Sequence, residues 1–233
     1  MCTVTFIAKG NDDFILTSNR DELPERKTLP PEVYEEEGVK LVYPKDAVAG
    51  GTWIGLSKKN RLINLLNGGF EPHTRKPHYR MSRGLVVKQL LTAEDAVLKI
   101  KHFDFEDIEP FTIILVDWSS SLKLYRLVWD GVKKHFKELN LGTHIWSSSP
   151  LYSPKMKTKR EQWLLDFLDN KETSAERLLE FHHNAGEGNK EIDLQMDRCF
   201  IKTVSITQIV KNKNRVQMTY EDLKSGKINS IEL

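Results

Sequence analysis

The residue of this sequence best suited to covalent chemistry is Cys2, which directly follows the first methionine. Because aminopeptidases remove Met1 when the second side chain is small, we expect Cys2 to become the first residue of the mature chain. A free cysteine thiol has a pKa of about 8.5 and is a weak nucleophile until it loses its proton. The α-amine of the same residue, with a pKa of roughly 7.7–8.0, could accept that proton. Cys2 is therefore a candidate N-terminal nucleophile.

Such a nucleophile needs a group that orients the amine and donors that stabilise an oxyanion. Asp21, in the stretch SNRDE, is the candidate for orienting the amine, and Arg20 could hold charge beside the thiolate or a substrate carboxylate. Asn67 and the glycine amides after it could donate to the oxyanion. The competing interpretation is chance, because most sequences carry Asp, Arg and Asn near turns and the position of Cys2 could be incidental.

The elements expected around these residues would bring some of them together. Residues 2–8 alternate and are rich in β-branched side chains, which predicts a strand, and residues 14–18 predict a second strand after the turn KGNDD. This hairpin returns the chain to its start and places residues 19–21 beside Cys2. Residues 61–69 predict another strand that ends in a turn at Asn67-Gly68-Gly69.

The rest of the chain predicts a mixed fold. Residues 23–44 are rich in Pro and Glu with little periodicity, which indicates a long surface loop. Helices are expected within residues 82–103 and 154–185, and strand pairs within residues 111–130 and 199–222. Because the strands come mainly in adjacent pairs, they favour antiparallel sheets. We expect an α+β protein with two sheets and outer helices, in a single domain over residues 1–233.

Composition excludes several classes of protein. The chain has 233 residues, 39% hydrophobic and 29% charged, with a formal net charge of +2, which is too balanced to indicate a nucleic-acid partner. No signal peptide is expected, and no apolar run approaches the roughly 20 residues of a membrane-spanning helix. The two cysteines make no disulfide framework or zinc motif, so we expect a reduced cytoplasmic protein with no metal and no cofactor.

Other reactive side chains have simpler interpretations. Cys199 lies in a strand-like context and is expected to be buried as a small apolar residue. His182 and His183, near the end of a predicted helix, are expected on its surface rather than in a metal site. A basic stretch is either a solvated loop or an electropositive rim for an anionic substrate; its members are His73, Arg75, Lys76, His78, Arg80 and Arg83.

Four motifs in order carry a resemblance to a known family: SNRDE, AGGTWIGL, LLNGG and SRG, after the N-terminal MC hairpin. The sequence resembles the NRDE family, which includes the TANGO2 (transport and Golgi organisation 2) proteins. That family is similar to the N-terminal nucleophile hydrolases, especially the penicillin V acylase and bile-salt hydrolase branch. The resemblance implies an αββα four-layer sandwich of two antiparallel sheets between helix layers.

The same resemblance implies a role for each candidate. Cys2 would be the nucleophile, Asp21 would orient the amine, and Asn67 would belong to the oxyanion hole. Arg20 lies near the arginine of the acylases, although NRD is arranged differently from their RNxD pattern. Ser148, in SSSP, stands where the acylases carry the asparagine of TNSP, and its hydroxyl is shorter with a single donor.

A second departure lies near the C-terminus. Val204, in KTVSIT, stands where the family often has the arginine of GTRS. Lys202 is the nearby residue that could compensate, although lysine does not replace the bidentate donor pattern of arginine.

Two functions are therefore expected of this chain. The first is hydrolysis of a non-peptide C–N amide bond in a small molecule by Cys2. The alternative, which the two departures favour, is a binding or trafficking protein that kept the fold without the chemistry. It would take a hydrophobic ligand and serve haem or lipid mobilisation or secretory-pathway organisation.

Overall fold

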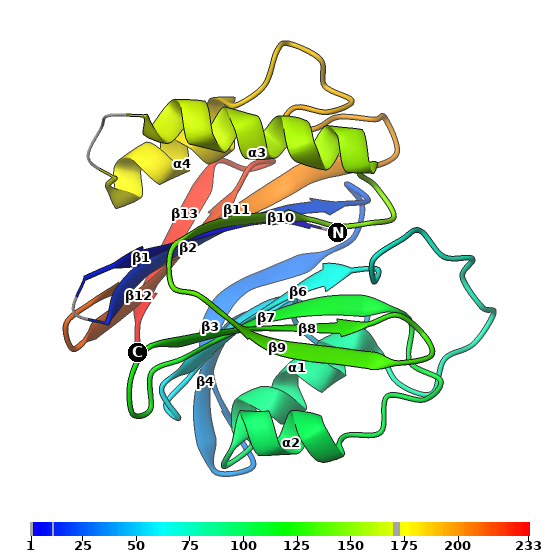
Figure 1. Cartoon of the computed structure of the whole chain (residues 1–233), viewed down its shortest axis with the longest axis vertical. Coiled ribbons are helices and arrows are strands. Elements are labelled where there is room, and N and C mark those ends of the chain that lie inside the picture. Colours follow the sequence, from blue (N-terminus) through cyan, green and yellow to red (C-terminus); the bar gives the residue numbers. More distant parts are fainter. Residues whose placement is uncertain (1, 11, 170–172) are drawn as a thin grey trace. The chain divides into compact units, whose positions relative to one another are not determined.

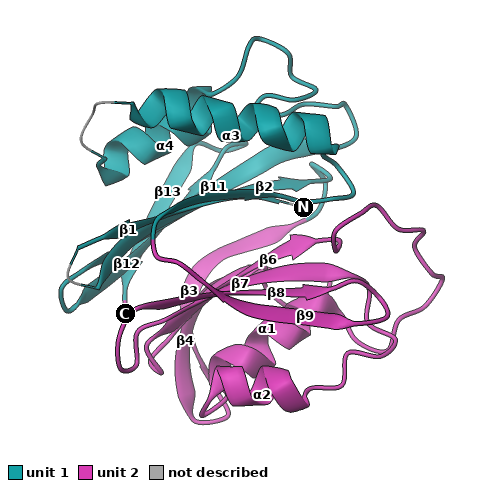
Figure 2. Ribbon diagram, viewed as in Figure 1, with its two compact units in different colours: residues 1–26, 142–232 teal, residues 27–141, 233 magenta. Residues whose placement is uncertain are grey.

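The computed structural model describes residues 2–10, 12–169 and 173–233. These residues form two compact units, coloured separately in Figure 2. Unit 1 combines residues 1–26 and 142–232, and unit 2 comprises residues 27–141 and 233. Each unit holds one antiparallel sheet and two helices, so the predicted α+β class with two antiparallel sheets is confirmed.

Unit 1 is built on a six-stranded sheet in the order β10-β1-β2-β11-β12-β13 (Figure 1). Its strands are β1 (Cys2–Lys9), β2 (Asp13–Glu22), β10 (Thr143–Ser147), β11 (Lys202–Asn212), β12 (Arg215–Asp222) and β13 (Lys227–Glu232). The helices α3 (Pro154–Leu168) and α4 (Ala175–Asn184) cover one face of this sheet. Residues from both chain ends thus pair in one sheet, in which β2 lies between β1 and β11.

The helix-covered face of unit 1 carries a compact apolar cluster. Ile7 and Ile15 lie opposite each other on β1 and β2 and pack against Leu178 and Phe181 of α4 and against Leu194. Side chains alternate along a strand, so Cys2, with an even number, points to the other face from Ile7. The alternation seen in the sequence therefore assigns the thiol to the face without helices.

Unit 2 is a seven-stranded meander in which the strands follow their chain order. Its strands are β3 (Thr28–Glu36), β4 (Val39–Asp46), β5 (Ile54–Ser57), β6 (Arg61–Asn67), β7 (Phe111–Asp117), β8 (Lys123–Trp129) and β9 (Lys134–Leu139). Helix α1 (Arg83–Thr92) packs on β4, β5 and β6, and α2 (Ala96–His102) packs on α1. No helix in the described ranges is both long and apolar enough to cross a membrane.

The predicted surface loop over residues 23–44 is wrong, because most of it forms the β3–β4 hairpin. Glu37 and Gly38 both have positive φ angles, 51° and 73°, as the tight turn between two twisted strands requires. Pro30 and Pro31 are tolerated because β3 is the edge strand of its sheet and its pairing register shifts at that point. The two prolines disfavour a strand in the sequence pattern, although β3 pairs with the largely buried strand β4.

Two of the glycine motifs have a packing role within unit 2. A Cβ atom on Gly51 would lie 2.7 Å from the backbone of Gly84, and one on Gly84 would lie 2.9 Å from the backbone of Thr52. The first turn of α1 therefore lies directly on the segment that precedes β5. In the AGGTWIGL and SRG stretches, Gly51 and Gly84 allow close packing of α1 on its sheet. Their role in this contact is structural and not catalytic.

Candidate active site

Cys2 and Arg20 face each other at the end of the β1–β2 ladder. They are directly paired in the antiparallel register, so their side chains lie on the same face of the sheet. Both are buried, with exposed fractions of 1% for Cys2 and 3% for Arg20. The Arg20 guanidinium lies 3.6 Å from a carboxylate oxygen of Glu22. The predicted proximity of the NRD stretch to Cys2 thus follows from the hairpin register.

Ser148 meets Cys2 from the other side, at the end of β10. Its backbone N–H donates to the Cys2 carbonyl oxygen over 3.0 Å. The side chain is 1% exposed, and its hydroxyl has no hydrogen-bond partner among the described residues. A buried hydroxyl without a partner is uncommon, and it keeps a donor available at this end of the sheet.

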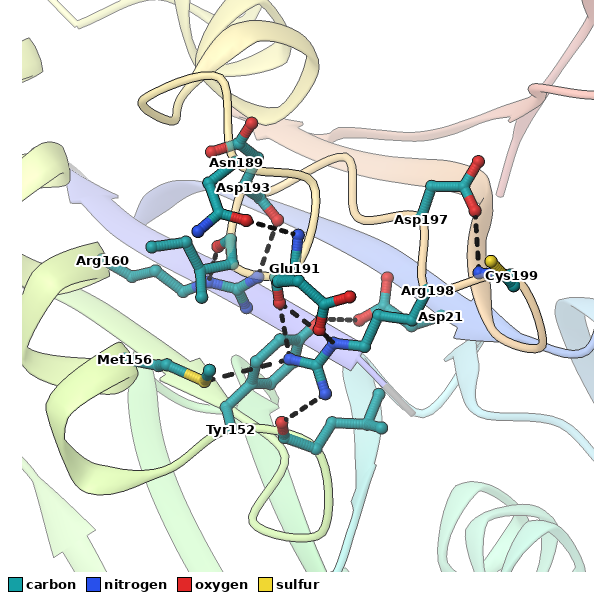
Figure 3. A network of polar contacts seen from close by, with 12 residues as sticks. Asp21, Tyr152, Met156, Arg160, Asn189, Glu191, Asp193, Asp197, Arg198 and Cys199 are labelled. Atoms are coloured by element: carbon teal, nitrogen blue, oxygen red, sulfur yellow. Dashed lines mark hydrogen bonds and ion pairs between the residues drawn. The ribbon is translucent and has the colours of Figure 1, made fainter.

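Asp21 lies one step beyond the Cys2–Arg20 pair, in the direction of the start of the chain. One of its carboxylate oxygens accepts a hydrogen bond of 2.6 Å from the Tyr152 hydroxyl (Figure 3). The other accepts a hydrogen bond of 2.7 Å from the hydroxyl of Thr203, its pairing partner on β11. The carboxylate is therefore fixed by two hydroxyl donors from separate elements.

Burial controls the protonation of both groups. It raises the pKa of the Cys2 thiol, the Asp21 charge adds to this rise, and Arg20 and a hydrogen bond from Ser18 oppose it. Burial also raises the pKa of the Asp21 carboxyl, against the opposing effect of its hydrogen bond from Tyr152. The thiol therefore needs a base before it can attack a carbonyl.

Asn67 lies in unit 2, at the end of β6 and opposite Phe111 of β7. The turn after it uses Gly68 at a φ of +84°, whose N–H donates to the Pro110 carbonyl over 2.9 Å. The predicted strand and turn are present. The oxyanion role of Asn67 toward Cys2 stays a prediction, since Cys2 belongs to unit 1.

The second departure noted in the sequence has no compensation from Lys202. Val204 lies between Thr203 and Ser205, where the pairing of β11 with β2 shifts by one residue. The Lys202 ammonium instead forms an ion pair of 2.9 Å with Asp197, and both side chains are partly exposed. The Lys202 charge is thus paired with Asp197, which precedes β11, and it does not replace an arginine at position 204.

Two expectations about reactive side chains are wrong. Cys199 is exposed rather than buried, because it precedes β11 in a tight turn at a φ of +61°. His182 is fully buried rather than on the surface. Only His183 is partly exposed, and it pairs with Glu221 over 2.9 Å. His182 lies on the side of α4 that faces the sheet, where it contacts Thr5 and Asn19.

His182 joins α4 to the strands of the candidate site. Its Nδ1 lies 2.6 Å from the Asn19 side-chain oxygen, and its Nε2 lies 2.8 Å from the Thr5 hydroxyl. The Asn19 amide donates to two backbone carbonyls, those of His182 and Leu194, so its oxygen is left to accept from the imidazole. Burial, with smaller contributions from His183 and Arg160, lowers the pKa of His182 to about 3.

This buried imidazole predicts a loss of stability in acid. His182 takes up a proton near pH 6.5 in the unfolded chain but only near pH 3 in the folded one, so the free energy of unfolding falls as the pH drops through this window. At 1.36 kcal/mol for each pKa unit, the loss approaches roughly 5 kcal/mol by pH 3. Urea unfolding between pH 7 and pH 4 should show a steeper decline for the native chain than for His182→Gln. Equal slopes would contradict this account.

The basic stretch of unit 2 is largely neutralised by acidic side chains. Glu109 lies within 4 Å of three basic groups, those of His73, Arg75 and Arg83. Lys76 and Arg80 form ion pairs with Asp107 and Asp104, respectively. These pairs favour the solvated-loop interpretation over the electropositive rim.

Comparison with known proteins identifies the family. The family model of Transport and Golgi organisation 2 (TANGO2) matches residues 1–222. The chain belongs to the TANGO2 family. No curated protein matched it at the level of sequence. The predicted resemblance is thus confirmed over nearly the whole TANGO2-family chain.

Solved structures similar to this TANGO2-family chain include a hydrolase, an acylase and an amidase. A variant of conjugated bile acid hydrolase from Clostridium perfringens matches with a TM-score of 0.59 and 10% identity, over 99% of this chain and 92% of its own. Penicillin V acylase from Agrobacterium tumefaciens matches with a TM-score of 0.59 and 14% identity, over 100% and 86%. The Caenorhabditis elegans ortholog of N-acylethanolamine-hydrolyzing acid amidase matches with a TM-score of 0.62 and 11% identity, over 90% and 92%. At these identities the likeness shows the fold, which is that of the N-terminal nucleophile hydrolases.

Proposed function

We propose that this TANGO2-family protein is an N-terminal cysteine hydrolase that cleaves a non-peptide C–N amide bond in a small molecule. The observation that carries the proposal is the convergence at one end of a single sheet of Cys2, its paired Arg20, the fixed Asp21 carboxylate and Ser148. The names of the similar structures support it, because a bile acid hydrolase, a penicillin V acylase and an acid amidase all carry this fold.

The proposed reaction has two stages. The Cys2 thiol passes its proton to its own α-amine, which Asp21 orients, and the sulfur attacks the amide carbonyl. The C–N bond then breaks, the proton moves from the α-ammonium to the leaving nitrogen, and an acyl-thioester remains on Cys2. Water, deprotonated by the same amine, attacks the thioester and releases the carboxylic acid, and the thiol regains its proton.

The remaining residues stabilise charge in this proposal. Arg20, opposite Cys2, favours the thiolate over the thiol. The Ser148 hydroxyl is assigned to the oxyanion, where loss of one donor typically costs about 2.7–4 kcal/mol of transition-state stabilisation. For Asn67, the oxyanion role rests on the family resemblance alone. The protein would act in the cytoplasm as a single domain and would need no cofactor.

The test is the intact mass of the purified protein before and after treatment with iodoacetamide at pH 7. The expected masses correspond to a chain without Met1 and to fast labelling at one site, which peptide mapping assigns to Cys2. Because Cys199 is exposed and also carries a thiol, the assay is run on Cys199→Ala. Retained Met1 together with an unlabelled Cys2 would overturn the proposal.

A binding protein without chemistry is the second candidate. It is favoured by the raised pKa of the Cys2 thiol, which burial causes, and by Val204 at the position of the expected arginine. Such a protein would bind a hydrophobic ligand such as haem or an acyl chain. The Cys2→Ala variant should then bind this ligand as well as the native chain does. A haem absorption spectrum that does not change at high protein concentration would exclude the haem form of this function.

A further inference from the structure

Tyr152, just before α3, is buried between two arginines. Its side chain is 1% exposed, and the guanidinium carbon of Arg160 lies 3.6 Å from the centroid of its ring. The guanidinium carbon of Arg198 lies 5.4 Å from the same centroid. Figure 3 shows both arginines gathered around the ring, with the Tyr152 hydroxyl directed at Asp21. Cation–π contacts of this kind hold an aromatic ring in one orientation.

Arg160 links this ring to the strands that carry the candidate site. Its guanidinium donates to the Thr3 hydroxyl over 2.5 Å and to the Ser147 hydroxyl over 3.3 Å. Thr3 is adjacent to Cys2, and Ser147 is adjacent to Ser148. Two further hydrogen bonds, of 3.0 Å and 2.8 Å, go to the backbone carbonyls of Ile192 and Asp193. With four acceptors and an exposed fraction of 1%, Arg160 is fixed in place.

Arg198 fixes the backbone on the other side of the tyrosine. It donates to the carbonyl of Leu151, the residue before Tyr152, over 2.9 Å. It also donates twice to the carbonyl of Glu191, over 3.0 Å and 2.6 Å. Arg198 therefore connects the segment of residues 191–198 to the ring of Tyr152 and to the backbone just before it.

We propose that Tyr152 is a positioning residue that sets the orientation and charge of Asp21. This inference rests on the proposed function, in which Asp21 orients the α-amine of Cys2. A buried carboxyl tends to stay protonated, and a hydroxyl that donates to it favours the charged form. Tyr152 and Thr203 donate to different oxygens of Asp21, so together they hold the carboxylate in one orientation.

The sequence offers no reason to select this tyrosine, because it lies between Pro150 and Pro154 in a stretch without periodicity. Its role follows from three contacts that converge from α3, from the 191–198 segment and from β2. The Tyr152 hydroxyl donates to Asp21 and also has a hydrogen bond with the buried Arg160 side chain, so its proton is directed at the carboxylate.

Tyr152→Phe tests this inference, with Tyr125→Phe as the matched control in unit 2. A panel of N-acyl amides is hydrolysed over a range of pH. We expect Tyr152→Phe to lower kcat by about 10- to 100-fold with little change in KM, the effect of one lost hydrogen bond to a charged group. The acidic limb of the pH–rate profile should move upward by about one pH unit, because Asp21 loses a donor that favours its charged form. Thr203→Val should move the limb in the same direction.

A carboxyl NMR titration of Asp21 gives a second readout that needs no turnover. We expect the pKa of Asp21 to be higher in Tyr152→Phe than in the native chain and unchanged in Tyr125→Phe. If the native chain hydrolyses an amide but Tyr152→Phe keeps its kcat and its acidic limb, the positioning role is overturned. If the native chain hydrolyses nothing, the proposed function fails, and an unmoved Asp21 titration then overturns this inference as well.

Discussion

Replacing Cys2 with alanine is expected to abolish amide hydrolysis, with turnover reduced at least about 10³-fold. The reason is that the thiol is the only proposed nucleophile, and the acyl-thioester cannot form without it. The measurement is steady-state hydrolysis of any amide that the native chain cleaves, with the fold checked by circular dichroism.

Cys199→Ala is the matched control for this substitution. It removes the other thiol of the chain, which is exposed in the turn before β11, and should leave turnover unchanged. If Cys2→Ala keeps turnover on the same substrates, the nucleophile is another group and the proposed mechanism is wrong.

Replacing Asp21 with asparagine is expected to lower turnover by about 10²- to 10⁴-fold. Asparagine has nearly the same shape, but its NH2 group would face a hydroxyl that now donates to a carboxylate oxygen. The amine of Cys2 would also lose its charged partner. Steady-state kinetics on the same amides measure the loss, and Asp107→Asn, at an exposed ion pair of unit 2, is the control.

The same Asp21 variant separates catalysis from simple thiol reactivity. The Asp21 charge adds to the rise that burial causes in the pKa of Cys2, so Asp21→Asn should lower that pKa. Labelling of Cys2 by iodoacetamide at pH 7 should therefore be no slower than in the native chain, even as turnover falls. Parallel losses of labelling and turnover would indicate a general disturbance of the site instead.

Local patterning was enough to predict much of unit 1. The β-branched alternation of β1 and β2 and the turn between them predict that residues 19–21 lie beside Cys2. The exact register, with Arg20 opposite Cys2, comes from the structure. Ser148 was found only through the family resemblance, because its approach to Cys2 depends on the pairing of β10 with β1 across more than 130 residues. Long-range pairing of this kind leaves no mark in a local pattern.

Other features were hidden for physical reasons. Pro30 and Pro31 are unfavourable in most strands, but the edge strand β3 accommodates them where its register shifts. Arg160 carries a charge that usually indicates exposure, yet it is buried because four oxygen acceptors surround its guanidinium. His182 is buried because Asn19 and Thr5 satisfy both ring nitrogens. In each case the partners come from elements that are distant in the sequence.

The most direct test of the central claim is to trap the acyl-enzyme. The native chain is mixed with a slowly hydrolysed N-acyl amide, quenched in acid within seconds, and its mass and N-terminal peptide are measured. The proposed mechanism predicts one added acyl group, as a thioester on a Cys2 that has lost Met1. Turnover of the amide without any acyl group on Cys2, or by a chain that retains Met1, would contradict it.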